Sequence, residues 1–100
     1  FNVYPAEVER VLDQLSAIRE ASVVGRANED TGEEVVACIV FHAGQTLPTT
    51  EIILHCRKLL SKYKVPHSIY ILPELPKTLV GKVDKKILQE RLNSGEYQLC

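Results

Sequence analysis

The sequence predicts a small α+β domain in which helices pack on a three-stranded sheet. Three observations lead to this fold class. The chain has only 100 residues, its apolar residues recur at helical spacing in some segments and form short β-branched runs in others, and glycine, proline or polar stretches separate the segments. The expected order is helix, strand, strand, helix, strand, helix. A chain of this length supports one modest core, so residues 1–100 are expected to form a single domain.

Three segments have the apolar spacing of amphipathic helices. Residues 5–15 begin with a proline, which favours the first helical turn, and their apolar side chains recur on one face. A second helix is expected to begin at the threonine pair 49–50, one of which would cap it. The third begins at Val83 and stops at the Asn-Ser-Gly sequence of residues 93–95.

Three β-branched segments predict the strands. Residues 21–25 end at a glycine, and the polar segment 26–33 is expected to be the loop to the next strand. Residues 35–41 are almost continuously apolar, which is typical of a strand buried on both faces. Residues 68–72 are the third strand. Two prolines and a glycine in residues 73–81 predict a loop.

Composition and charge exclude several classes of function. The formal net charge is −1, so no strong field attracts nucleic acid or an anionic membrane. The longest apolar run is far shorter than the roughly 20 residues of a transmembrane segment. No cysteine or histidine spacing indicates a metal site. Cys38, Cys56 and Cys100 are odd in number and widely spaced, which indicates reduced thiols in a cytoplasmic protein, with Cys38 in the core.

The carboxylates are given no catalytic role. The acidic residues of the expected hairpin loop are Glu29, Asp30, Glu33 and Glu34. In a loop of this kind we expect them to be solvated. Glu7 and Glu9 lie near the start of the first helix, where the helix dipole is sufficient to explain them.

The loop that leads to Lys82 is the segment most suggestive of chemistry. Two prolines stiffen it, and Gly81 allows the backbone to turn tightly or to approach a ligand. Lys82 stands beside the amino end of the expected third helix, where the helix dipole disfavours a cation. A lysine there is better explained if it shares an anion with the helix end, such as a phosphate or a carboxylate. The alternative is an exposed loop lysine that reaches into water.

Four segments recur in order along a known kind of domain. They are residues 1–9 (Phe-Asn-Val-Tyr-Pro-Ala-Glu-Val-Glu), 21–25 with the acidic loop that follows, 63–66 (Tyr-Lys-Val-Pro) and 75–82 (Leu-Pro-Lys-Thr-Leu-Val-Gly-Lys). Together they resemble the C-terminal subdomain of the adenylate-forming superfamily, which includes acyl-CoA synthetases, luciferases and the adenylation domains of peptide synthetases. The chain starts at Phe1, just after the family's interdomain hinge. We therefore expect a mobile C-terminal subdomain, present here as a fragment of a longer enzyme.

The resemblance implies an acid–thiol ligase that works in two steps. A carboxylate attacks the α-phosphate of ATP, which is supplied with Mg²⁺, and an acyl-adenylate and pyrophosphate form. The thiol of coenzyme A then displaces AMP. By this resemblance, Lys82 matches the family lysine that bridges the attacking carboxylate and the adenylate. A cation is needed there because it lowers the repulsion between two anions and fixes their orientation.

The resemblance also implies acceptor-binding residues and a partner domain. Phe1, Asn2 and Val3 match the segment that lines the approach of the thiol once the domain has rotated. Gly81 belongs to the same motif as the lysine, and Lys64 is placed to meet phosphates of coenzyme A. ATP and the carboxylic acid would bind to a large N-terminal domain, so the isolated chain is expected to be inactive. The sequence departs from the family at Val80, since Ser or Thr is common at that position of the family.

Two alternatives stay open at this point. The first is the same domain from a peptide-synthetase adenylation module, which loads a carrier protein; Lys64 argues mildly against it, because such modules usually have Met at that position. The second is a non-catalytic α+β interaction domain with helices over an open sheet edge. The sequence does not identify the acid, since the residues that select it would lie in the large domain.

Overall fold

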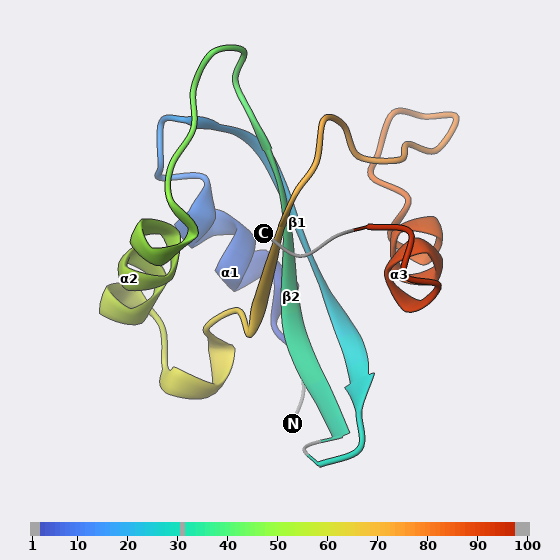
Figure 1. Cartoon of the computed structure of the whole chain (residues 1–100), viewed down its shortest axis with the longest axis horizontal. Coiled ribbons are helices and arrows are strands. Elements are labelled where there is room, and N and C mark those ends of the chain that lie inside the picture. Colours follow the sequence, from blue (N-terminus) through green and yellow to red (C-terminus); the bar gives the residue numbers. More distant parts are fainter. Residues whose placement is uncertain (1–2, 31, 98–100) are drawn as a thin grey trace.

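A computed structural model describes residues 3–30 and 32–97, and it confirms the predicted order of helices and strands (Figure 1). The helices and strands are α1 (Pro5–Leu12), β1 (Ile18–Asn28), β2 (Gly32–Phe41), α2 (Thr49–Leu59), β3 (Ser68–Ile71) and α3 (Lys85–Asn93). A 3-10 turn, η1 (Lys62–Lys64), lies between α2 and β3. The predicted α+β fold class is therefore correct.

The sheet is mixed, with the strand order β1-β2-β3. β1 and β2 are antiparallel neighbours, whereas β3 runs parallel to β2. A parallel neighbour requires a crossover connection, and α2 with η1 provides it. Cys38 lies at the centre of the register, opposite Ser22 of β1 and opposite Tyr70 of β3.

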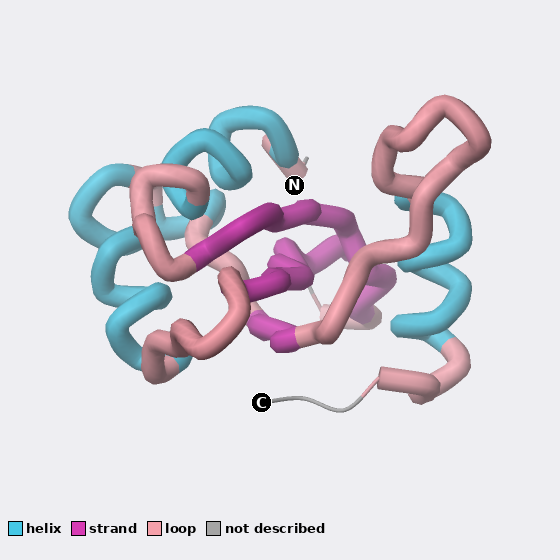
Figure 2. The backbone as a smooth tube through the Cα atoms, turned by 90° about the horizontal axis from the view of Figure 1, so that it is seen from above, coloured by secondary structure: helices cyan, strands magenta, loops and turns pink. Residues whose placement is uncertain are grey.

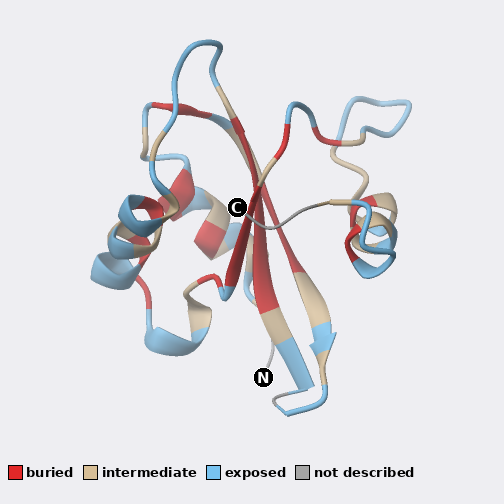
Figure 3. Cartoon of the chain, in the orientation of Figure 1, coloured by how far each residue is buried: buried red, intermediate tan, exposed pale blue. Residues whose placement is uncertain are grey.

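Helices cover both faces of the sheet: α1 and α2 lie on one side and α3 on the other (Figure 2). Alternate residues of β2 point to opposite faces, so Ala37 and Ile39 join the core under α1 and α2, whereas Val36 and Cys38 join the core under α3. The prediction of a strand buried on both faces is confirmed. Burial is concentrated in the middle of the sheet, and the end of the β1–β2 hairpin is exposed (Figure 3).

The first hairpin is longer than predicted. Most of residues 26–33, expected as a loop, belongs to the two strands, because β1 continues to Asn28 and β2 begins at Gly32. The prediction was wrong because these residues are polar. In the structure their polar side chains pair across the strands: the Nε of Arg26 donates to Oε1 of Glu34 at 2.7 Å. Cross-strand pairing of this kind stabilises a strand without an apolar pattern.

Two predicted helix starts also differ from the structure. The N-cap of α2 is Pro48, whose side chain cannot accept a hydrogen bond, so the predicted threonine cap is wrong. α3 begins two residues later than predicted, because Asp84 is its N-cap and accepts a hydrogen bond from the backbone N–H of Ile87 at 3.1 Å. Its stop agrees with the prediction, since Gly95 has φ +78°, a left-handed conformation suited to glycine.

Candidate functional site

Residues 76–84, which overlap the C-terminal part of the predicted loop 73–81, form a hairpin held by backbone hydrogen bonds (orange in Figure 1). At its base, the backbone N–H of Asp84 donates to the carbonyl of Pro76 at 2.8 Å. Lys77 and Val83 form an antiparallel bridge directly above. The loop predicted from its prolines therefore has a defined backbone, and that backbone carries Lys82.

The tip of this hairpin depends on a glycine. The N–H of Thr78 donates to the carbonyl of Lys82 at 2.7 Å, and the N–H of Gly81 donates to the carbonyl of Thr78 at 3.0 Å. Gly81 has φ +85°, which a residue with a side chain adopts only under strain. The side chains of Leu79 and Val80 are fully or largely exposed at the tip. Gly81 is thus required for the reversal that brings the chain back to Lys82.

Lys82 is exposed, and its ammonium has no hydrogen-bond or ion-pair partner among the described residues. The lysines on either side of it are paired: Nζ of Lys77 lies 2.9 Å from Oε1 of Glu20, and Nζ of Lys85 lies 2.8 Å from Oε2 of Glu9. At the start of α3 the carboxylate of Asp84 accepts a hydrogen bond from one backbone N–H, that of Ile87. This negative charge already interacts with the helix end, so we expect an anion near Lys82 to be bound by the lysine side chain.

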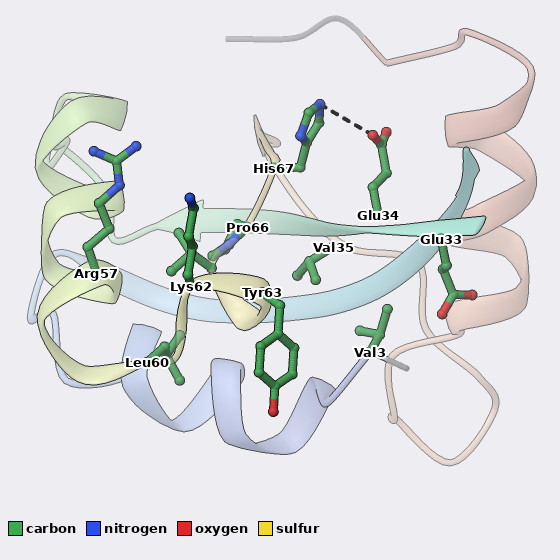
Figure 4. A pocket seen from close by; sticks show the side chains of 11 residues that line it. Val3, Glu33, Glu34, Val35, Arg57, Leu60, Lys62, Tyr63, Pro66 and His67 are labelled. Carbon is green, nitrogen blue, oxygen red and sulfur yellow. Dashed lines mark ion pairs between the residues drawn. The ribbon is translucent and has the colours of Figure 1, made fainter. Parts of the chain in front are cut away.

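A groove of about 1000 Å³ lies beside η1 and the start of β2 (Figure 4). Val3 lies on its wall; Val3 is the part of the predicted acceptor segment that the structure describes, while Phe1 and Asn2 lie outside the described residues. Val35 and other apolar residues also line it, and Arg57 and Lys62 lie together at one end. The groove therefore combines an apolar wall with two cationic side chains at one end and with the carboxylates of Glu33 and Glu34 at the other.

Lys64 has a different set of contacts. Its Nζ lies 2.8 Å from Oε2 of Glu7, 4.7 Å from the ring centroid of Tyr4 and 5.6 Å from that of Tyr63. The hydrogen bond to Glu7 raises the pKa of Lys64. These contacts attach η1 to α1. The sequence did not single out Arg57 or Lys62 for binding, because cations at the end of a helix cannot be told apart until the structure shows which of them line the same groove as Val3.

Three acids that we assigned to solvent or to the helix dipole have specific partners. Glu7 pairs with Lys64 and Glu9 with Lys85. Glu34 pairs with Arg26, and its side chain is only 10% exposed, so the expectation of a solvated carboxylate is wrong for this residue. The partners lie on other elements, which the spacing of residues along the chain does not reveal.

Residues 3–30 and 32–97 lack two kinds of feature. No three side chains of His, Cys, Asp or Glu lie together in this part of the chain so that they could hold a metal ion. None of its helices has both the length and the apolar character that crossing a membrane requires. The hairpin with Lys82 and the groove with Val3 are thus the two features to be explained.

A mixed three-stranded sheet with helices on both faces and an exposed hairpin lysine agrees with the predicted kind of domain. The comparison with known families is decisive: the chain belongs to the AMP-binding enzyme C-terminal domain family, whose sequence model matches residues 7–82. The predicted resemblance to the adenylate-forming superfamily is confirmed. The match ends at Lys82.

The similar proteins include an acyl-CoA ligase and a CoA synthetase. Over 90 residues the chain is 43% identical to a mitochondrial medium-chain acyl-CoA ligase of Danio rerio, a match that covers 90% of this chain and 15% of that ligase. Among solved structures, ATP-bound MatB from Rhodopseudomonas palustris has a TM-score of 0.86 and 33% identity over 90% of this chain and 18% of its own. The o-succinylbenzoate CoA synthetase of Bacillus subtilis in complex with its acyl-adenylate intermediate has a TM-score of 0.79 and 34% identity over 92% of this chain and 18% of its own. The chain thus spans less than a fifth of these proteins.

Proposed function

We propose that this chain is the mobile C-terminal domain of an ATP-dependent acid–thiol ligase that forms acyl-CoA. In the first half-reaction an oxygen of the carboxylate attacks the α-phosphorus of ATP and the bond to pyrophosphate breaks. In the second, the sulfur of coenzyme A attacks the acyl carbon, the bond to AMP breaks and the thiol proton is released. Family membership and the ligases named above support this class of reaction.

The unpaired ammonium of Lys82 is the observation that carries the proposal. It stands on a hairpin closed by backbone hydrogen bonds, at an exposed position, while the neighbouring lysines are paired with glutamates. Two anions approach each other in the first half-reaction, so a positioned cation between them lowers the barrier. A lysine suits this role, because a compact charge on a long stem reaches across a domain boundary.

A large N-terminal domain of the same enzyme is the proposed partner. It would hold ATP with its Mg²⁺ and the carboxylic acid, since the chain corresponds to less than a fifth of its relative. The relatives do not identify the acid for this chain, and the domain that would contact the acid is the large one.

We place coenzyme A in the groove beside η1 during the second half-reaction. Val3 and the apolar wall suit the pantetheine arm, and Arg57 and Lys62 offer positive charge to its phosphates. Lys64 was the predicted phosphate contact, but its pairing with Glu7 makes it the weaker candidate.

The position of the groove supports a rotation of this domain between the two half-reactions. In Figure 1 the hairpin of residues 76–84 lies at the upper right, whereas η1 lies at the lower left. One fixed docking of the domain would not present both surfaces to the same reacting carboxyl group. A rotation that withdraws Lys82 and brings the groove forward would do so.

Acyl-CoA formation is favoured over loading of a carrier protein by the described activities of the relatives.

The cytoplasm is the compartment we propose, because Cys38 and Cys56 are free thiols. The Danio rerio relative is described as mitochondrial, so imaging of the tagged full-length protein decides between the two compartments.

The test is Lys82→Ala in the full-length enzyme. Adenylate formation, followed as pyrophosphate exchange, should slow by about 10²–10³-fold, the usual loss for a preorganised charge contact. Conversion of a supplied acyl-adenylate to acyl-CoA should be unchanged. Lys86→Ala is the matched control, since Lys86 is an exposed lysine on α3. Equal loss in both half-reactions, or no loss in the first, would overturn the proposal.

A further inference from the structure

The carboxylate of Glu9 joins α1 to β1 and α3. Its Oε2 accepts a hydrogen bond from the backbone N–H of Val23 at 2.8 Å and another from Nζ of Lys85 at 2.8 Å. The same ammonium donates to the carbonyl of Val23 at 3.0 Å. Both backbone groups of one β1 residue are thus bound by the two members of an ion pair.

This arrangement is more constrained than an ordinary surface ion pair. The side chains of Glu9 and Lys85 are 24% and 41% exposed, and a pair at that exposure by itself stabilises a fold little. However, β1 is an edge strand of the sheet, and its outward N–H and C=O at Val23 need partners. Glu9 and Lys85 supply them: Lys85 is held by two hydrogen bonds, to Glu9 and to the carbonyl of Val23, and Glu9 is itself held by the N–H of Val23.

Lys85 stands directly at the base of the hairpin that carries Lys82. It is the first residue of α3, and the residue before it, Asp84, closes the hairpin onto the carbonyl of Pro76. The other arm of the hairpin is also attached to β1, through the ion pair between Lys77 and Glu20. Both arms of the hairpin therefore rest on the same edge strand.

We propose that Glu9 and Lys85 are positioning residues for Lys82. Their ion pair fixes the hairpin base on β1, so that the unpaired ammonium meets its reacting groups at one defined place. The inference rests on the proposed function of Lys82 in adenylate formation. A small displacement of a positioned group lowers the rate steeply. Loss of the ion pair between Glu9 and Lys85 therefore lowers kcat of the first half-reaction. The KM values for ATP and the acid, which bind elsewhere, are unaffected.

The first experiment is Lys85→Met in the full-length enzyme, with Lys86→Met as the matched control. Lys85→Met should lower kcat of adenylate formation by about tenfold or more, on the scale known for misplaced catalytic groups, at unchanged KM for ATP and acid. Conversion of a supplied acyl-adenylate should be unaffected. Lys85→Arg should restore most of the rate, because a guanidinium reaches the same carboxylate. Failure of this rescue, or a change in KM alone, would contradict a positioning role.

The second experiment separates this inference from the proposed function. If Lys85 acts through Lys82, the double variant Lys82→Ala/Lys85→Met should be no slower than Lys82→Ala alone. Full additivity of the two losses would overturn the inference while leaving the role of Lys82 intact. No effect of Lys82→Ala would overturn the proposed function itself.

Glu9→Gln provides a variant that tests the same pair if Lys85→Met does not fold. The amide oxygen still accepts from the N–H of Val23, but the charge that holds Lys85 is gone. The same selective fall in kcat of adenylate formation is expected. An unchanged kcat in a folded Glu9→Gln enzyme would contradict the positioning role.

Discussion

Arg26 and Glu34 face each other directly across β1 and β2, and Nη2 of the arginine lies 2.6 Å from Oε1 of the glutamate. The same guanidinium donates from Nη1 to the hydroxyl of Tyr70 on β3 at 2.7 Å. Oε2 of Glu34 accepts from the side-chain amide of Asn28 at 2.9 Å and lies 3.3 Å from Nε2 of His67. One carboxylate therefore organises a polar cluster that joins all three strands of the sheet.

This cluster predicts how stability depends on pH. Burial acts to raise the pKa of Glu34, but the hydrogen bonds from Asn28 and Arg26 and the nearby positive charge outweigh it, so the pKa lies below the ordinary value of 4.5. A depressed folded-state pKa means that ionised Glu34 stabilises the fold above about pH 4.5 and that this contribution is lost as the pH falls through the folded-state pKa. Glu34→Gln should therefore lower the free energy of unfolding at pH 7 by about 1–3 kcal/mol.

The measurement for Glu34→Gln is urea denaturation of the 100-residue chain at a series of pH values. The difference in the free energy of unfolding between the variant and the unmodified chain should shrink as the pH is lowered below 4.5, the ordinary pKa of a glutamate. Glu33→Gln is the control, because the neighbouring carboxylate is exposed. A difference that stays constant down to the lowest pH would show that the charge of Glu34 is not what stabilises the cluster.

Gly81→Ala tests the geometry of the hairpin tip. A Cβ at this position meets no atom within 4 Å, so the substitution acts through the backbone, at φ +85°, and not through a clash. The strain of about 1–2 kcal/mol is relieved by a shift of the turn, which moves Lys82. We expect slower adenylate formation with little loss of thermal stability.

Gly95→Ala is the matched control for Gly81→Ala. Its φ is +78° and its added Cβ also meets nothing within 4 Å, but it lies at the far end of α3. It should cost similar stability and leave adenylate formation unchanged. If both variants slow the reaction equally, the effect comes from general destabilisation and not from the position of Lys82.

Arg57→Gln tests the proposed acceptor groove. Removal of one charge-assisted contact to a phosphate corresponds to a roughly tenfold rise in KM for coenzyme A. Adenylate formation should be unchanged, because coenzyme A enters only afterwards. Lys58→Gln removes a charge from the next residue of α2, which is exposed, and should have little effect. An unchanged KM for coenzyme A in Arg57→Gln would place its phosphates elsewhere.

The order of the helices and strands could be predicted from the sequence because the signals for it are local. The apolar run of residues 35–41 has the composition of a doubly buried strand wherever it lies in space. Gly81 and Gly95 mark the reversals because only glycine adopts a positive φ without strain. Lys82 was also found locally, from the motif that contains it. Its unpaired state came only from the structure.

The tertiary structure decided which side chains meet. Glu9 and Lys85 are 76 residues apart in the chain, and their hydrogen bond exists because α1 and α3 reach the same edge strand from different sides. The cross-strand partner of Arg26 turned an expected loop into strand, and the packing of the elements placed Arg57 and Val3 on the lining of one groove. Apolar periodicity and turn residues act over a few positions, so the sequence determines the elements. Ion pairs and grooves depend on how those elements pack, and no local pattern contains that information.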